Sequence, residues 1–118
     1  MRARFVERTG VRVHFEMSGE GPPVVLLHGG AGDRTMWRHA SYVEGLDGYT
    51  CVLVDSRGHG HSDGPVGEAA YRLEEYAADV EAVIEALGAA CVALWGYSDG
   101  GRHVAAAVAE CVRTWLAP

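Results

Sequence analysis

Apolar and polar residues alternate in two stretches near the start of the chain, Arg4 to Arg8 and Val11 to Met17. Alternation with a period of two places one face of a strand in a core and the other face in water. Thr9-Gly10 lies between the two stretches and suits a two-residue hairpin turn. The pattern therefore predicts an antiparallel pair of strands at this end of the chain.

Three later strands are predicted by short runs that are almost wholly apolar: Val24 to Leu27, Cys51 to Val54 and Cys91 to Trp95. Runs of this kind are typical of parallel strands that are covered on both faces of the sheet. A turn rich in glycine and proline, Ser18 to Pro23, precedes the first run, and a polar loop, Ser56 to Gly67, follows the second. The three runs are expected to form the centre of the fold.

Helices are predicted between and after these runs. The first is expected over about Thr35 to Leu46, with Asp33 available as its cap. The second, about Arg72 to Leu87, has apolar residues every three or four positions and is followed by a glycine that can end it. The third begins near Asp99, and the stretch Val112 to Leu116 either finishes this helix or begins another strand.

The order of these elements predicts the class of the fold. From residue 24 onward, strands and helices alternate, and this order favours parallel strands joined by helical crossovers. We therefore expect an α/β fold: a mostly parallel sheet with an N-terminal antiparallel hairpin and covering helices, in one domain over residues 1–118.

Composition and charge mainly exclude certain classes of partner and targeting segment. The chain has 118 residues, enough for one domain, and 16 acidic against 10 basic residues give a net charge of −6. Lysine and arginine do not cluster, which argues against a nucleic acid or an anionic membrane as partner. Neither a signal-peptide core nor a membrane span is predicted, so we expect a cytoplasmic protein. Its cysteines are expected to be reduced thiols in the core, with a disulfide or a catalytic thiol as the alternative: Cys51, Cys91 and Cys111.

The stretch that points to chemistry is Gly96-Tyr97-Ser98-Asp99-Gly100-Gly101, directly after the third apolar run. A G-x-S-x-G sequence between a strand and a helix is the pattern of a nucleophile elbow, a tight turn that projects the serine hydroxyl. Gly96 and Gly100 have a steric reason to be glycine, because strand and helix pass too close at such a turn for a side chain. The pentapeptide alone is weak evidence in a chain with 16 glycines.

Two upstream blocks strengthen it. His28-Gly29-Gly30 follows the first apolar run, and Asp55-Ser56-Arg57-Gly58-His59-Gly60-His61-Ser62 follows the second. Together, in this order and spacing, the three blocks resemble the N-terminal half of an α/β-hydrolase-fold serine hydrolase, over about Phe5 to Val108. The resemblance implies a partial α/β-hydrolase fold, without the cap and the C-terminal strands of the family.

The resemblance also implies roles for individual residues. Ser98 would be the nucleophile, and the backbone N–H groups of Gly30 (or Ala31) and Asp99 would form the oxyanion hole. His28 would brace the oxyanion loop. The implied reaction is acyl transfer to water on an ester, amide, lactone or similar small molecule, with no cofactor and no metal.

In the second block, Asp55 to Ser62, the resemblance implies that Asp55 and Arg57 brace the turn and that His59 packs behind the site.

The family order of the catalytic triad is serine, then an acid, then a histidine. After Ser98 the candidates are Asp99, His103 and Glu110, and none is placed to act as the acid or the base. His103 would point along the flank of its helix. We therefore expect the chain as given to be catalytically incomplete, with little or no activity alone.

The outer neighbour of the strand Cys91 to Trp95 would also be missing, which would leave an apolar edge. The alternative function is thus a non-enzymatic interaction module or inactive fragment that pairs through this edge, with a complementary C-terminal half or a second copy as partner.

The sequence also contains parts of the motifs of two other kinds of site. Gly30 and Gly32, with Asp55 after the next strand, resemble part of a dinucleotide-binding fingerprint, but the third glycine is missing. His59, His61 and Asp63 have the spacing of part of a zinc signature, but the next position is Gly64 and not histidine. Neither pattern explains the hairpin or the elbow.

Overall fold

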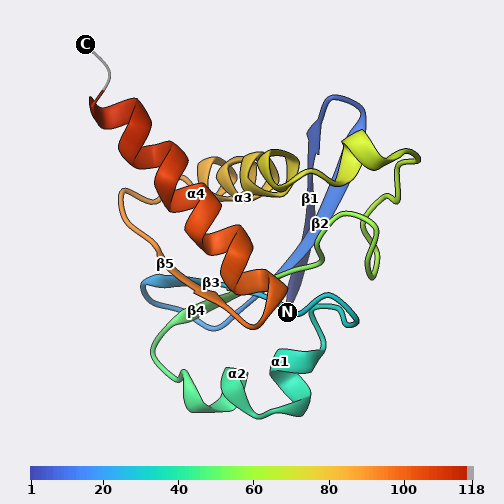
Figure 1. Cartoon of the computed structure of the whole chain (residues 1–118). Helices are drawn as coiled ribbons and strands as arrows, with labels where there is room; N and C mark the ends of the chain where they lie inside the picture. The colour runs from blue at the N-terminus through green and yellow to red at the C-terminus, as the bar shows by residue number, and fades with distance from the viewer. Residues whose placement is uncertain (117–118) are drawn as a thin grey trace.

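The described residues form one five-stranded sheet with helices packed on both of its faces (Figure 1). The computed structural model describes the backbone of residues 1–116 and the side chains of residues 1–109. The strand order is β1-β2-β4-β3-β5. This arrangement confirms the predicted α/β class and the antiparallel hairpin at one side of a parallel centre.

The hairpin consists of β1 (Arg2–Arg8) and β2 (Val11–Ser18), paired antiparallel from Arg2 opposite Met17 to Arg8 opposite Val11. Thr9 and Gly10 turn the chain with φ angles of 51° and 80°. A two-residue hairpin turn with positive φ at both central residues has a twist that matches the twist of its flanking strands. The Thr9-Gly10 dipeptide and the alternation of apolar and polar residues predicted this hairpin, and the prediction is confirmed.

The three apolar runs form β3 (Pro23–Leu27), β4 (Thr50–Val54) and β5 (Ala93–Gly96). β3 pairs parallel with β4 on one side and with β5 on the other, while β2 pairs antiparallel with β4. β5 thus lies at the edge of the sheet, as the sequence predicted for the strand before the elbow.

The helices lie in two layers (Figure 1). α3 (Leu73–Leu87) and α4 (Asp99–Leu116) cover one face of the sheet, and the short helices α1 (Met36–His39) and α2 (Tyr42–Gly45) cover the other. A 3₁₀ helix, η1 (Glu68–Tyr71), leads into α3. Alternate strand residues therefore enter two cores: Val25, Leu27, Val52 and Val54 pack toward α3 and α4, and Val24, Leu26, Cys51 and Leu53 pack around Trp37.

The prediction of a single helix over residues 35–46 is wrong. The structure divides it into α1 and α2, because Ser41 between them has φ 64°, in the left-handed region. Asp33 Oδ1 accepts the Thr35 N–H at 2.8 Å, so Asp33 does support the start of this segment. The other two helices are confirmed: Gly88 ends α3 at φ 65°, and α4 continues through residues 112–116 instead of giving way to a strand.

The prediction for the cysteines is confirmed only in part. Cys51 is a free thiol buried in β4, but Cys91 is a free, exposed thiol. The strand begins at Ala93, two positions later than predicted, so Cys91 lies in the connection before it. Cys111 lies outside the residues whose side chains are described. A search of the described helices finds none that is long and apolar enough to cross a bilayer.

Candidate active site

The turn from β5 into α4 carries Ser98 at its apex. Ser98 has φ 56°, a left-handed conformation that is uncommon for a residue with a side chain. A Cβ atom on Gly96 would overlap the Gly100 carbonyl, and one on Gly100 would overlap the Leu27 and His28 carbonyls. The two glycines are therefore required by close backbone packing, as their spacing predicted, and the turn holds the exposed Ser98 outward.

The predicted oxyanion residues lie at the same turn. A Cβ atom on Gly29 would stand 3.7 Å from the Ser98 Cβ, and one on Gly30 would overlap the Asp99 carboxylate. The loop after β3 is thus packed directly against the start of α4. Gly30, which is far from Ser98 and Asp99 in the sequence, meets this adjacent pair at one place in the structure.

An aromatic cavity opens beside Ser98. Its volume is about 740 Å³, and its lining combines the elbow with the α1–α2 segment: Met36, Trp37, Ala40, Tyr42, Trp95, Gly96, Tyr97 and Ser98. Tyr42 stands edge-on to both Trp37 and Trp95, with ring centroids 5.1 and 6.2 Å apart. Sequence reasoning missed this wall, because the aromatic residues belong to two segments that only the fold brings together.

His28 fixes the loop after β3. Its Nε2 atom lies 3.1 Å from the Ser56 N–H, so this nitrogen accepts, and Nδ1 carries the proton that it donates to the Gly29 carbonyl at 2.6 Å. Burial lowers the pKa of His28, which favours this neutral form. The bracing role expected for His28 is therefore what its contacts provide.

Asp55 is fully buried at the end of β4, and hydrogen-bond donors surround its carboxylate. It accepts the backbone N–H and the Nη1–H of Arg34, both at 2.9 Å, and the N–H of His61 at 3.0 Å, while His14 Nδ1 lies 3.0 Å away. A carboxylate used in this way is not free to bind a ribose. It braces the turn, as the sequence had suggested.

The zinc pattern is not assembled either. His59 is bonded to the carbonyls of Arg57 and Gly30, and Asp63 accepts the Arg12 N–H at 2.8 Å. A different group, His14, Asp55 and His61, does have its ligand atoms within 4.8 Å of one another. The Arg34 guanidinium already occupies the Asp55 oxygen that this group would offer to a cation.

Comparison with known proteins gives the family. The sequence profile described as alpha/beta hydrolase fold matches residues 22–111. The chain belongs to the α/β-hydrolase fold family. It is 33% identical to epoxide hydrolase 4 of Mus musculus over 90% of this chain and 30% of that protein. It is 34% identical to epoxide hydrolase B of Mycobacterium tuberculosis over 98% of this chain and 32% of that protein.

Solved structures agree with this assignment. An epoxide hydrolase from an endophytic Streptomyces superposes with a TM-score of 0.82 at 33% identity, over 92% of this chain and 33% of that one. A putative alpha/beta hydrolase from Nostoc gives the same TM-score at 25% identity, over 95% of this chain and 39% of that one. The chain thus spans about a third of the length of the curated relatives it matches.

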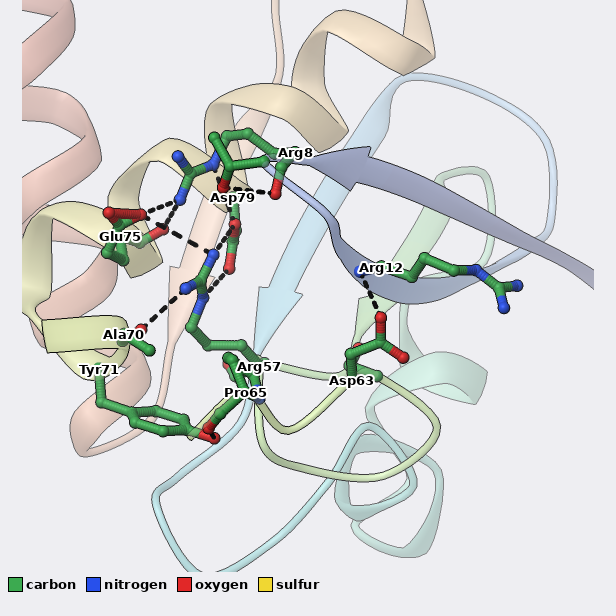
Figure 2. A network of polar contacts seen from close by, with 12 residues as sticks. Arg8, Arg12, Arg57, Asp63, Pro65, Ala70, Tyr71, Glu75 and Asp79 are labelled. Carbon is green, nitrogen blue, oxygen red and sulfur yellow. Dashed lines mark hydrogen bonds and ion pairs between the residues drawn. The ribbon is translucent and has the colours of Figure 1, made fainter. Parts of the chain in front are cut away.

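Within this hydrolase framework, Arg57 ties the loop after β4 to the helical layer (Figure 2). Its guanidinium donates to both Asp79 oxygens at 2.7 and 2.8 Å and to the Ala70 carbonyl at 2.8 Å. Arg8 of β1 reaches the same carboxylate at 3.2 Å and also binds Glu75. The hydrogen bonds with Asp79 raise the pKa of Arg57, so the guanidinium stays charged. The network bears out the bracing role expected of Arg57.

One signal of this network is present in the sequence. Asp79 lies on the apolar stripe of α3, between Tyr76 and Val83, and a charge at such a position needs a buried partner.

His103 takes no part in the elbow. It is nine-tenths buried and stacks on Tyr76, with ring centroids 4.1 Å apart and planes 9° from parallel. Burial lowers its pKa to about 4, so the ring is neutral at ordinary pH. It faces a smaller cavity of about 260 Å³, whose lining does not include Ser98. The expectation that His103 does not reach the serine agrees with this position, and the Glu110 side chain lies outside the described residues.

Proposed function

We propose that residues 1–118 are the N-terminal part of an α/β-hydrolase domain and supply its nucleophile and oxyanion-binding groups. Ser98 is the nucleophile, and the backbone N–H groups of Gly30 and Asp99 bind the oxyanion. The observation that carries the proposal is the Ser98 elbow at φ 56°, packed against Gly29 and Gly30. The substrate is a small molecule with an ester, amide, lactone or similar acyl group.

In the proposed reaction, the Ser98 oxygen attacks the acyl carbon and its proton passes to a base. The two N–H groups stabilise the negative oxygen of the tetrahedral intermediate, each by roughly 3–4 kcal/mol. The alcohol or amine then leaves with a proton, and water cleaves the acyl-serine ester. The aromatic cavity of about 740 Å³ beside Ser98 suits the apolar part of such a substrate.

The nature of the nucleophile favours acyl substrates over the epoxides named in several relatives. If the Ser98 oxygen opened an epoxide, the product would be an ether between the serine and the substrate. Water does not cleave a simple ether at neutral pH, so the enzyme would be blocked after one event. An acyl-serine ester, by contrast, is readily hydrolysed.

The proposal includes a base and an acid that the described side chains do not supply. His28 and His59 bond to the backbone, and His103 stacks on Tyr76. Loss of the histidine from a working triad lowers turnover by about 10⁶. We therefore expect the chain alone to show at most the weak catalysis of an oxyanion hole.

The test is covalent labelling of the purified chain with a fluorophosphonate probe, followed by identification of the labelled peptide. Because the described side chains supply no base, labelling should be slow, but it should occur at Ser98, disappear in Ser98→Ala and persist in Ser18→Ala, a matched serine substitution at the end of β2. Slow release of nitrophenol from a nitrophenyl ester, without conversion of styrene oxide, would support the acyl assignment. Absence of labelling, or labelling that survives Ser98→Ala, would reject Ser98 as the nucleophile.

The edge position of β5 favours assembly as a second candidate function. Among the described residues, β5 pairs with β3 alone, and Trp95 in this strand is 40% exposed. An open strand with apolar side chains is a template for another strand. The partner is a complementary C-terminal half of the hydrolase or a second copy of this chain. Light scattering after size exclusion distinguishes a monomer, a defined dimer and a hetero-complex.

A cytoplasmic location is also part of the proposal. Cys51 and the exposed Cys91 are both free thiols, and an exposed free thiol is best maintained in a reducing compartment.

A further inference from the structure

His59 lies between the two loops that meet behind the elbow. Its Nε2 atom is 2.7 Å from the Gly30 carbonyl oxygen, and its Nδ1 atom is 3.0 Å from the Arg57 carbonyl oxygen. One ring therefore joins the loop after β3 to the loop after β4. The ring of His28 lies beside it, with centroids 5.1 Å apart.

The partners of the ring define its protonation. A carbonyl oxygen only accepts hydrogen bonds, and a neutral imidazole has one N–H and one lone pair. A neutral His59 would thus satisfy one carbonyl and turn a lone pair toward the other. Only the ring with a proton on both nitrogens donates both bonds. His28 differs, because its Nε2 atom faces an N–H group, that of Ser56.

The two histidines hold consecutive peptide groups. His28 binds the carbonyl of the Gly29–Gly30 peptide, and His59 binds the carbonyl of the Gly30–Ala31 peptide. In a trans peptide the N–H points away from its carbonyl, so a fixed carbonyl also fixes the direction of the N–H. The N–H groups concerned are those of Gly30, the proposed oxyanion donor, and of Ala31, the next residue of the same loop.

We propose that His59 is a positioning residue that aligns the oxyanion loop when its ring carries two protons and loosens the loop when the ring is neutral. The proposal rests on the proposed function for the meaning of the loop, but not for the hydrogen bonds themselves. As pH rises and His59 loses a proton, one of its two bonds is lost. If the lost bond is the one to the Gly30 carbonyl, the loop keeps the contacts of His28 and of the Gly32 N–H on the Gly29 carbonyl.

The groups around His59 allow this change. From β3 it is faced by His28, whose pKa is lowered by burial, and from α4 by Asp99, Arg102 and His103 across the same cavity. Tyr71 and Tyr76 complete the wall. Burial lowers the pKa values of His28 and His103, which favours their neutral forms, and Asp99 and Arg102 pair with each other at 3.6 Å. His59 is then the histidine of this cavity whose charge alters the loop.

The direct test is a pH titration of the whole chain by NMR. The ring nitrogens of His59 and the amide nitrogens of Ala31 and Gly58, which directly follow the two accepting carbonyls, are recorded from about pH 5 to about pH 8. Both ring nitrogens should be protonated at low pH, and the two amides should shift along the titration curve of the His59 ring. If the ring shows only one N–H at low pH, or the amides do not follow it, the proposal is wrong.

His59→Gln, which keeps one donor, should abolish the coupled shift, whereas His39→Gln, at an exposed histidine in α1, should not. In the labelling assay, His59→Gln should react about tenfold more slowly than the parent at low pH, less than the 10²–10³ that loss of an oxyanion donor costs. This difference should shrink toward none at high pH. A constant difference would reject proton-dependent alignment. Failure of the parent to label at all would reject the proposed function and leave the NMR result standing.

Discussion

The two sides of the elbow are built in opposite ways. On the β4 side, Asp55 and Arg57 are 0% and 2% exposed, and their charges are matched by Arg34 and Asp79. On the β5 side, the strand has one described neighbour, and Ser98 is exposed beside a cavity. The supporting loops are thus fixed within this part of the chain, while the environment of the nucleophile depends on what packs against β5.

This difference has a physical cause. A buried ion pair holds its position because either partner alone would be left uncompensated in a medium of low dielectric constant. A strand at the edge of a sheet has no such constraint on its open side. The framework that directs the oxyanion loop can therefore be rigid even where the reactive serine is uncovered.

The largest effect is expected from Arg57→Ala. Among the described side chains, the substitution leaves the Asp79 carboxylate, which is 4% exposed, with Arg8 as its one cationic partner, at 3.2 Å. Breaking a buried pair costs about 3–5 kcal/mol of unfolding free energy. Urea unfolding should show this loss, whereas Arg102→Ala, at a largely exposed pair with Asp99, should stay within about 0.5 kcal/mol. Equal losses would remove the distinction between the two sides.

The next effect is the pH dependence contributed by His103. Its folded pKa of about 4 lies below the ordinary 6.5, so the unfolded chain binds the proton more readily. The contribution of His103 to the free energy of unfolding is fully present above about pH 6.5. It decreases by on the order of 3 kcal/mol as the pH falls to about 4. Urea unfolding across this range should show the slope.

His103→Phe keeps a ring against Tyr76 but cannot be protonated, so this variant should lose that part of the slope. His39→Gln, at an exposed histidine, should retain it. A His103→Phe profile that matched the parent would contradict burial of a neutral ring.

The smallest effect on stability is expected from Trp95→Lys at the open edge. Trp95 is 40% exposed but packs edge-on against Tyr42, so its replacement should lower the unfolding free energy by about 1–2 kcal/mol. A lysine at an edge strand discourages pairing with another strand, so any self-association should weaken. Unfolding curves and light scattering measure both. A loss above about 2 kcal/mol would show that the β5 side is as constrained as the β4 side.

Much of the fold was predictable because its signals are local. The Thr9-Gly10 turn, the apolar runs of β3 and β4 and the glycine after α3 each impose a conformation on their own neighbours. The break at Ser41 was not predictable, because apolar residues continue through it and only a left-handed φ divides the helix. Cys91 was misplaced since the apolar run begins before β5 does.

The sequence by itself determined the family blocks, the order of the elements and the glycines that allow a serine elbow, because these depend on spacing and on backbone sterics. Only the tertiary structure decided that Gly30 and Asp99 are in contact, that Asp55 and Arg57 are used up in buried pairs, and that His59 joins two loops. These facts depend on which groups face one another across the fold, and local sequence does not identify a partner that lies many residues away.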